Sequence, residues 1–294
     1  MPTSTEFFGY QFTNLGPLTT TYEPPASCTT ATTDHIYFAN VSDFNRGYGV
    51  ATCGAEKMSD CYPSGSAFDK VNSHNHKSGG MGTLDYFSPG VVCPKGWTTA
   101  GTFAQDDKKT KAGIFTTDDA TPDYQLPPED VWRGILEPGE TVAYCCPSGW
   151  HGGVWKGCFS SIEPFKSGSY SEYCSQGMPL SAIDEAYTVG TSVLSDPVIS
   201  FRTYDVSAST RPIITAQGPW PTDMDEVVII RNLPAVALIH KQEDVQDTDG
   251  IESGSSDGAD DADDNAASAM NGATLAPAVA VCVGILVGAG MLFN

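Results

Sequence analysis

Cysteines constrain this chain more than any other feature of its sequence. Eight of the nine precede a strongly acidic segment, and the ninth, Cys282, lies in a hydrophobic stretch near the C-terminus. An even set of this kind is typical of a disulfide framework in an oxidising compartment. Their spacing lacks the repeated close pairs of zinc sites, so we expect four disulfides and no metal site. The eight cysteines are Cys28, Cys53, Cys61, Cys93, Cys145, Cys146, Cys158 and Cys174.

The pairing of these cysteines is only weakly constrained by the sequence, because many connectivities are compatible with the same spacing. Adjacent cysteines rarely bond each other, since their Cβ atoms diverge. We therefore expect Cys145 and Cys146 to reach different partners. A local bridge between Cys53 and Cys61 is also expected, because turn residues follow at 62–65.

Acidic residues dominate the charge, with 36 Asp and Glu against 15 Lys and Arg, a net charge of −21. This balance argues against binding to nucleic acid or to anionic lipid, both of which need clustered basic residues. Ten of the acids fall in residues 243–264, which hold no base. We interpret 243–272 as a disordered acidic stalk; the alternative is an acidic loop folded onto a basic patch.

Residues 273–294 form a hydrophobic segment in which no side chain is charged. Its length is sufficient to cross a bilayer as a helix, so a membrane is an expected partner. The lack of basic residues after Lys241 also fits the signal for a glycolipid (GPI) anchor, in which small residues precede a spacer and a hydrophobic tail. Asn265 is then the expected attachment residue and Ser268 the second choice.

Residues 1–20 do not read as a secretory signal, since they lack a basic start and an apolar core. The disulfide pattern nevertheless indicates an extracellular body, as does the glycosylation sequon at Asn40. Either the true N-terminus is missing from this sequence, or the chain is a cytosolic tail-anchored protein with reduced thiols. We expect the former.

A five-residue pattern, Cys-Pro-x-Gly-Trp, occurs at 93–97 and again at 146–150. Proline followed two positions later by glycine indicates a tight turn in each copy. Trp97, Trp150 and Trp155 therefore lie near turns, where exposed rings could stack on sugars. The alternative is that these rings pack against the disulfides in the core.

Several segments resemble a group of Cys-rich cell-surface proteins of filamentous fungi: LGPLTTT at 15–21, PPASC at 24–28, YFSPG at 86–90, CPKGWTTA at 93–100 and TVAYCCPSGW at 141–150. The resemblance implies a Cys-rich ectodomain on one membrane segment at the fungal surface, and it supplies no catalytic site. Gly101 stands where that group has a cysteine, which implies that one of the group's disulfides is lost or re-paired here.

Short β-rich runs separated by Pro and Gly predict a mainly β fold for residues 1–242, a disulfide-stapled, loop-rich antiparallel sheet or sandwich. No amphipathic helix of 12 residues is evident outside the hydrophobic segment. The expected strands are 35–39, 141–145, 154–159, 187–194, 198–206, 212–216, 226–230 and 235–240.

Motifs that would carry chemistry are weak. The serine motif GSSDG at 254–258 lies in the expected stalk rather than at a strand-to-helix turn. The calcium-like run at 247–250 lacks the bidentate glutamate of a calcium loop. His74 and His76 lie in an expected solvated loop without a third ligand. No carboxylate pair can be assigned, and no cofactor is indicated.

These observations favour a non-enzymatic protein on the extracellular face of a fungal cell membrane. Its expected role is structural, adhesive or in contact with wall glycan, so cell-wall polysaccharide is an expected partner and nucleic acid is not. Two alternatives stay open, a secreted wall-modifying glycoside hydrolase and a cytosolic tail-anchored membrane protein.

Overall fold

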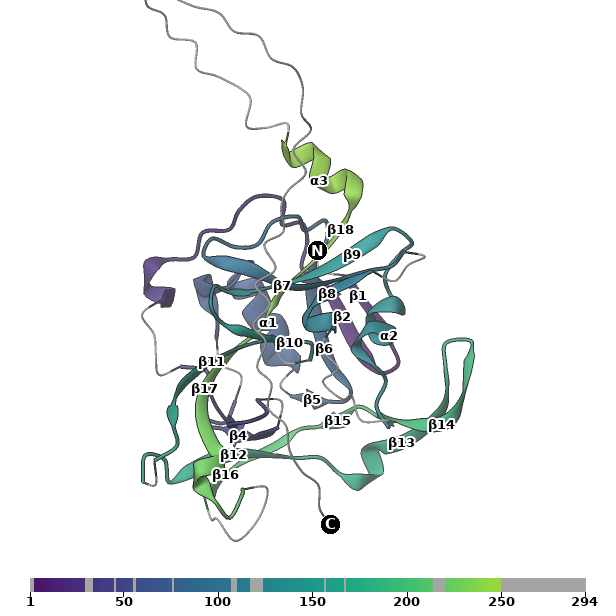
Figure 1. Ribbon diagram of the computed structural model, residues 1–294. Coiled ribbons are helices and arrows are strands. Elements are labelled where there is room, and N and C mark those ends of the chain that lie inside the picture. The colour runs from purple at the N-terminus through teal and green to yellow at the C-terminus, as the bar shows by residue number, and fades with distance from the viewer. Residues whose placement is uncertain are drawn as a thin grey trace, which may run out of the picture. The chain divides into compact units, whose positions relative to one another are not determined.

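The computed structural model describes residues 3–29, 34–44, 46–54, 57–75, 77–106, 110–116, 124–155, 157–166, 168–213 and 220–249. Most of these residues form strands, and two seven-stranded sheets make up the body (Figure 1). The mainly β fold and its antiparallel sheets are as the sequence predicts. The serine motif at 254–258, the expected anchor residues Asn265 and Ser268 and the hydrophobic segment lie outside the described residues.

The first sheet has the strand order β1-β2-β6-β18-β9-β7-β8. It is not wholly antiparallel, because β6 runs parallel to both of its neighbours, β2 and β18. Its strands are β1 (Thr3–Phe7), β2 (Tyr10–Asn14), β6 (Gly82–Phe87), β7 (Trp97–Ala104), β8 (Lys111–Gly113), β9 (Glu140–Pro147) and β18 (Val236–Lys241).

The second sheet has the order β10-β11-β17-β3-β4-β12-β16, and all its pairs are antiparallel. Its strands are β3 (Ile36–Asn40), β4 (Gly47–Val50), β10 (His151–Gly153), β11 (Gly157–Pro164), β12 (Glu172–Gly177), β16 (Ser207–Pro212) and β17 (Val227–Leu233). Two small pairs complete the β-structure, β13 (Ile183–Val189) with β14 (Ser192–Phe201) and β5 (Ser78–Gly79) with β15 (Tyr204–Asp205).

The chain crosses from the second sheet to the first between β17 and β18 (Figure 1). β17 begins with Val-Val-Ile-Ile, and β18 begins with the apolar run Val-Ala-Leu-Ile; Val and Ile favour strands. Pro234 separates the two strands, and a proline cannot donate to a strand ladder, so pairing with one sheet ends there. One stretch of chain, residues 227–241, therefore supplies a strand to each sheet, and the two sheets meet beside this stretch.

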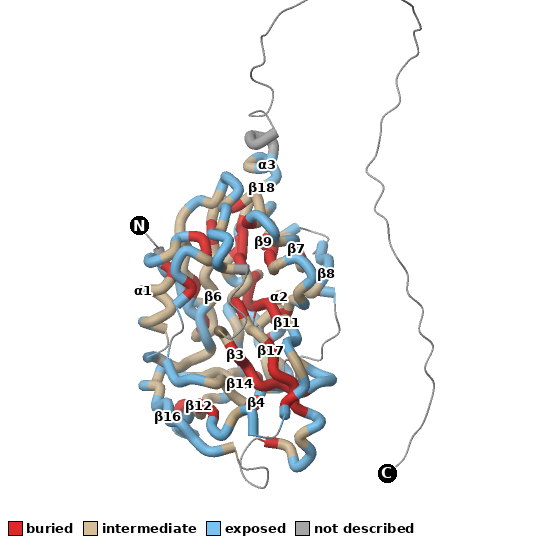
Figure 2. The backbone as a smooth tube through the Cα atoms, turned by 90° about the vertical axis from the view of Figure 1, so that its left-hand side faces the viewer, coloured by how far each residue is buried: buried red, intermediate tan, exposed pale blue. Residues whose placement is uncertain are grey.

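Alternate residues of the central strands pack on opposite faces, and both faces of each sheet are buried at these strands. In β3 all five residues are buried: Ile36 and Phe38 join one apolar cluster, whereas Tyr37 and Ala39 join the other. Figure 2 shows this burial concentrated in β3 and β17. Strands buried on both faces read as continuous apolar runs rather than alternating ones.

Among the described residues, three short α-helices accompany the sheets: α1 (Ser66–Asn75), α2 (Pro128–Arg133) and α3 (Gln242–Asp249). His74 lies in α1, so the loop expected at this histidine is wrong. α1 is held partly by Asp69, whose carboxylate accepts hydrogen bonds from the backbone of Met58 and Ser59 at 2.8 and 3.1 Å. The chain passes directly from β18 into α3, so the first residues of the expected stalk are helical.

The eight cysteines form four disulfides, with Cα–Cα distances of 5.0 to 5.7 Å. As expected, Cys145 and Cys146 reach different partners. The local Cys53–Cys61 bridge is wrong, because the β4 end lies beside β12 and brings Cys53 to Cys174 instead. The bridges are Cys28–Cys61, Cys53–Cys174, Cys93–Cys145 and Cys146–Cys158.

The two Cys-Pro-x-Gly-Trp copies both form tight turns. In each, the backbone N–H of the tryptophan donates to the proline carbonyl at 3.0 Å. The glycine has φ near +80°, a conformation that favours glycine. The two turns also touch, since Ser148 donates to the Gly96 carbonyl at 2.9 Å.

Strand positions differ from the expected ones mainly at turns. The expected strand 187–194 is a hairpin that turns between β13 and β14 at Gly190, and 154–159 begins too early because Val154 and Trp155 lie in a turn before β11. The expected strand 198–206 is interrupted between β14 and β15. β16 ends at Pro212, and 214–216 lie outside the described residues.

Candidate functional site

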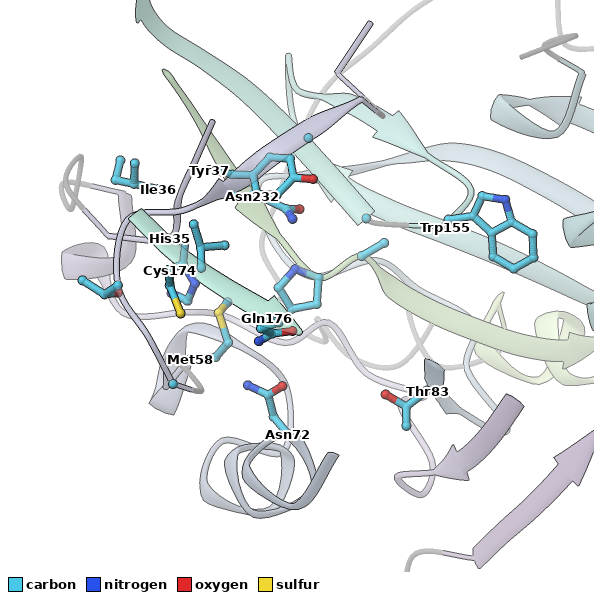
Figure 3. A pocket seen from close by; sticks show the side chains of 18 of the residues that line it. His35, Ile36, Tyr37, Met58, Asn72, Thr83, Trp155, Cys174, Gln176 and Asn232 are labelled. Carbon is cyan, nitrogen blue, oxygen red and sulfur yellow. The ribbon is translucent and has the colours of Figure 1, made fainter. Parts of the chain in front are cut away.

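A cavity of about 750 Å³ lies where the two sheets meet. The second sheet contributes β3, β4, β11, β12 and β17 to its lining, and the first contributes β6, β9 and β18. Figure 3 shows Tyr37 and Asn232 at one side of it, Asn72 of α1 at another, and Gln176 and Met58 between them. The volume is within the usual range for small-molecule sites.

Glycines in β4 let aromatic rings approach the backbone along the cavity wall. A Cβ atom at Gly47 would overlap the hydroxyl of Tyr37. One at Gly49 would lie 2.6 Å from the ring of Tyr173, and Gly49 also has a φ of +150°. The Gly-Tyr-Gly sequence of β4 therefore allows two tyrosines to line the site.

One carboxylate, Asp85, belongs to this lining. It stands on β6 beside Thr13 of β2, whose side chain hydrogen-bonds to it. Its Oδ1 atom is buried and has no hydrogen-bond partner. Burial raises the pKa of Asp85 to about 6, and the Thr13 hydrogen bond only partly opposes this effect.

A second buried acceptor faces the same cavity. Asn232 lies at the end of β17, next to the Pro234 crossing, and its Oδ1 atom has no partner. Buried polar atoms are normally hydrogen-bonded, because leaving one unpaired costs roughly 1–3 kcal/mol. The cavity thus presents two oxygen atoms that a donor could satisfy.

Two of the tyrosine hydroxyls in the lining, those of Tyr62 and Tyr144, are already engaged. Tyr62 donates to the Ala235 carbonyl at 3.0 Å. Tyr144 accepts from the indole of Trp132 at 2.9 Å and lies 3.4 Å from the Val154 carbonyl. Burial raises the pKa of both tyrosines, so both stay protonated at neutral pH.

Of the three tryptophans considered from the sequence, Trp155 alone lines the cavity. It is partly buried and stacks on Tyr10, with ring centroids 5.4 Å apart. Trp97 and Trp150 are partly buried against the cluster that contains Cys93 and Cys145. Arg231 lies over the Trp150 ring at 5.3 Å. The packing alternative therefore describes Trp97 and Trp150 better than an exposed stacking platform does.

Asn40, the sequon asparagine, is buried with 8% of its surface exposed. Its Nδ2 donates to the Tyr48 hydroxyl at 3.1 Å, and its Oδ1 accepts from the Ser42 N–H at 2.8 Å. A glycan would be attached through the same Nδ2 atom. This geometry argues against the glycosylation expected at Asn40, since the modified side chain could not keep its place.

Other features considered from the sequence stay apart from the cavity. His74 is exposed on α1, and the described residues contain no group of three or more His, Cys, Asp or Glu that could hold a metal ion. At Gly101 a Cβ atom would lie 2.7 Å from Ile114, which leaves no room for the cysteine that the resembling group carries there. Within the described ranges no helix is long and apolar enough to cross a membrane.

Sequence reasoning missed Asp85, Asn232 and the cavity itself. Asp85 lies in TLDYF, where an acid sits among residues typical of a strand. That isolated acid was the one available signal, because nothing local indicates which distant strands surround it. In comparisons with known proteins, no family model, no curated protein and no solved structure shows significant similarity to this chain.

Proposed function

We propose that this protein is a non-enzymatic binding module that holds a small, hydroxyl-rich ligand, such as a short stretch of wall glycan, in the cavity between its two sheets. The observation that carries the proposal is the pair of buried, unpartnered oxygen atoms of Asp85 and Asn232 in one cavity. Sugar hydroxyls are donors that can satisfy both. Trp155 supplies an aromatic face at the same site.

The number of carboxylates that line the cavity favours binding over hydrolysis. A glycoside hydrolase usually needs two carboxyl groups flanking the bond that is cleaved. Among the described residues that line the cavity, Asp85 is the single carboxylate. The two engaged tyrosines do not supply a base in its place.

The place of action is proposed to be the outer face of a fungal cell membrane. Four disulfides favour an oxidising compartment. The uncharged segment 273–294 supports attachment to a membrane, through a lipid anchor or a retained helix. The resemblance to fungal cell-surface proteins supports the same location.

Isothermal titration of the full-length chain with short soluble oligomers of glucose and of N-acetylglucosamine tests the function. The detergent should have no sugar headgroup, so that it cannot compete. We expect saturable binding without release of shorter sugars. Thr83→Trp, at an exposed lining position of β6, should weaken binding at least about tenfold by filling the cavity.

Thr98→Trp is the matched control, because Thr98 is equally exposed but lies on β7 and does not line the cavity. It should bind as the unmodified protein does. Equal loss in both variants, or no binding of any sugar by the unmodified chain, would contradict the proposed function. Release of shorter oligomers would support the hydrolase alternative.

A further inference from the structure

The cavity carries a negative charge without a cation opposite it. Asp85 keeps one hydrogen bond from Thr13, and its second oxygen is buried and unpaired. No lysine or arginine occurs among the described lining residues. The imidazole of the lining belongs to His35, which lies 3.9 Å from a different carboxylate, Asp34.

Burying a carboxylate without a counter-ion is unfavourable, and a charged donor relieves this cost better than a neutral one. The neighbouring groups do not provide such a donor. Tyr62 and Tyr144 are neutral and already hydrogen-bonded, α1 contributes Phe68 and Asn72, and the rest of the lining is uncharged apart from His35.

We infer that the cavity selects a ligand that carries a primary ammonium group beside hydroxyls, as an amino sugar does. The ammonium donates to Asp85 Oδ1, and a ligand hydroxyl donates to Asn232 Oδ1. The inference rests on the proposed function and specifies its ligand class. The net charge of −21 adds a field that draws cations toward the protein.

The pKa of Asp85 makes the selectivity depend on pH. Near pH 7 the carboxyl is mostly ionised, because its pKa is about 6. Near pH 5 it is mostly protonated, whereas an aliphatic ammonium keeps its charge. Selectivity for the amine should therefore be lost on acidification, while binding of neutral sugars is retained.

Titration of the full-length chain with glucosamine oligomers and with N-acetylglucosamine oligomers of equal length provides the test. We expect the amine form to bind at least about tenfold more tightly near pH 7. Asp85→Asn should remove this preference, because it should weaken binding of the amine form at least about tenfold more than binding of the acetylated form. Asp196→Asn, an exposed carboxylate on β14 outside the cavity, should keep the preference.

Three results would overturn the inference. Equal binding of both sugars by the unmodified chain would refute the ammonium site but leave the proposed function intact. Binding of neither would refute the ammonium site, and it would refute the proposed function as well if glucose oligomers also fail to bind. Spermidine, a cation without hydroxyls, should bind more weakly than the amino sugar; equal binding would refute the sugar part. If Asp85→Asn fails to fold, titrations of the unmodified chain between pH 7 and pH 5 replace it. A preference for the amine that persists near pH 5 would then refute the role of Asp85.

Discussion

Cys145 and Cys146 are neighbours on β9, and their disulfides run in different directions: Cys145 bonds Cys93 before β7, and Cys146 bonds Cys158 on β11 of the second sheet. Successive residues of a strand point to opposite faces, so an adjacent pair can serve two separate bridges. The Cys93–Cys145 bridge lies against the apolar cluster that contains Phe87 and Leu238. The Cys146–Cys158 bridge joins the first sheet to the second.

Removing the disulfides one at a time should destabilise the protein more, the longer the loop that the disulfide closes. Cys53–Cys174 spans 121 residues and Cys146–Cys158 spans 12. We expect alanine replacement of the first pair to lower the free energy of unfolding by about 5 kcal/mol, and of the second by about 3 kcal/mol. Urea unfolding of the two double variants measures both values.

Cys28–Cys61, with an intermediate separation of 33, is the internal reference for this series. Its loss should lie between the other two. A larger effect for Cys146–Cys158 than for Cys53–Cys174 would show that contacts between the sheets, and not restriction of the unfolded chain, dominate the contribution of that bridge.

Local patterns predicted much of this fold and almost none of the site. The apolar runs of β17 and β18 were both recognised as strands, because their β propensity is high. β18 was expected at 235–240 and lies at Val236–Lys241, whereas β17 was expected at 226–230 and continues to Leu233. The Cys-Pro-x-Gly-Trp turns were also correct, since a proline and a glycine fix the turn within five residues.

The missed elements depend on distant partners. β6 pairs with β2 and β18, some 70 and 150 residues away, and no local signal indicates that it runs parallel to both. The Cys53–Cys174 bridge follows from another long-range pairing, that of β4 with β12. Because the cavity forms from eight strands of two sheets, its residues could not be recognised before those pairings were known.

Trp155 should report on occupation of the cavity. It lines the cavity and stacks on Tyr10, whereas Trp97 and Trp150 pack against the apolar cluster that contains Cys145. We expect a bound sugar to change the tryptophan fluorescence, and Trp155→Phe to abolish at least about half of that change. Trp150→Phe is the control and should preserve it; the opposite pattern would place the ligand at the turns instead.

Asn40 should be unmodified in the folded protein, because its amide is buried and bonded to Tyr48. An enzyme that removes N-linked glycans is expected to leave the mass of the peptide containing Asn40 unchanged. Asn40→Gln should lower the free energy of unfolding by about 1–3 kcal/mol, since one buried and one partly buried hydrogen bond are disturbed.

An effect of Asn40→Gln on stability could come from the lost hydrogen bonds of Asn40 or from a lost glycan, and Ser42→Ala separates these two explanations. It destroys the sequon but keeps the backbone N–H that donates to Asn40 Oδ1 at 2.8 Å. If burial of the amide is what matters, Ser42→Ala is nearly as stable as the unmodified protein. Equal destabilisation by both variants, with loss of a glycan mass, would show that Asn40 is glycosylated.

Asp85 should destabilise the empty protein at high pH. Burial raises its pKa from 3.8 to about 6, so the folded state holds this proton more tightly than the unfolded state does. Its contribution to stability is therefore most favourable below the unfolded pKa and is lost as the pH rises through about 6. Near pH 8 the buried carboxylate costs at most about 3 kcal/mol.

Asp85→Asn removes this titration, so it should raise the free energy of unfolding by up to about 3 kcal/mol near pH 8 and change it little near pH 4. Urea unfolding at both pH values, with Asp196→Asn as the control, measures the difference. A stabilisation that is equal at the two pH values would show that packing, and not the buried charge, is responsible. Destabilisation near pH 8 would mean that the Thr13 hydrogen bond to the carboxylate outweighs the cost of its burial.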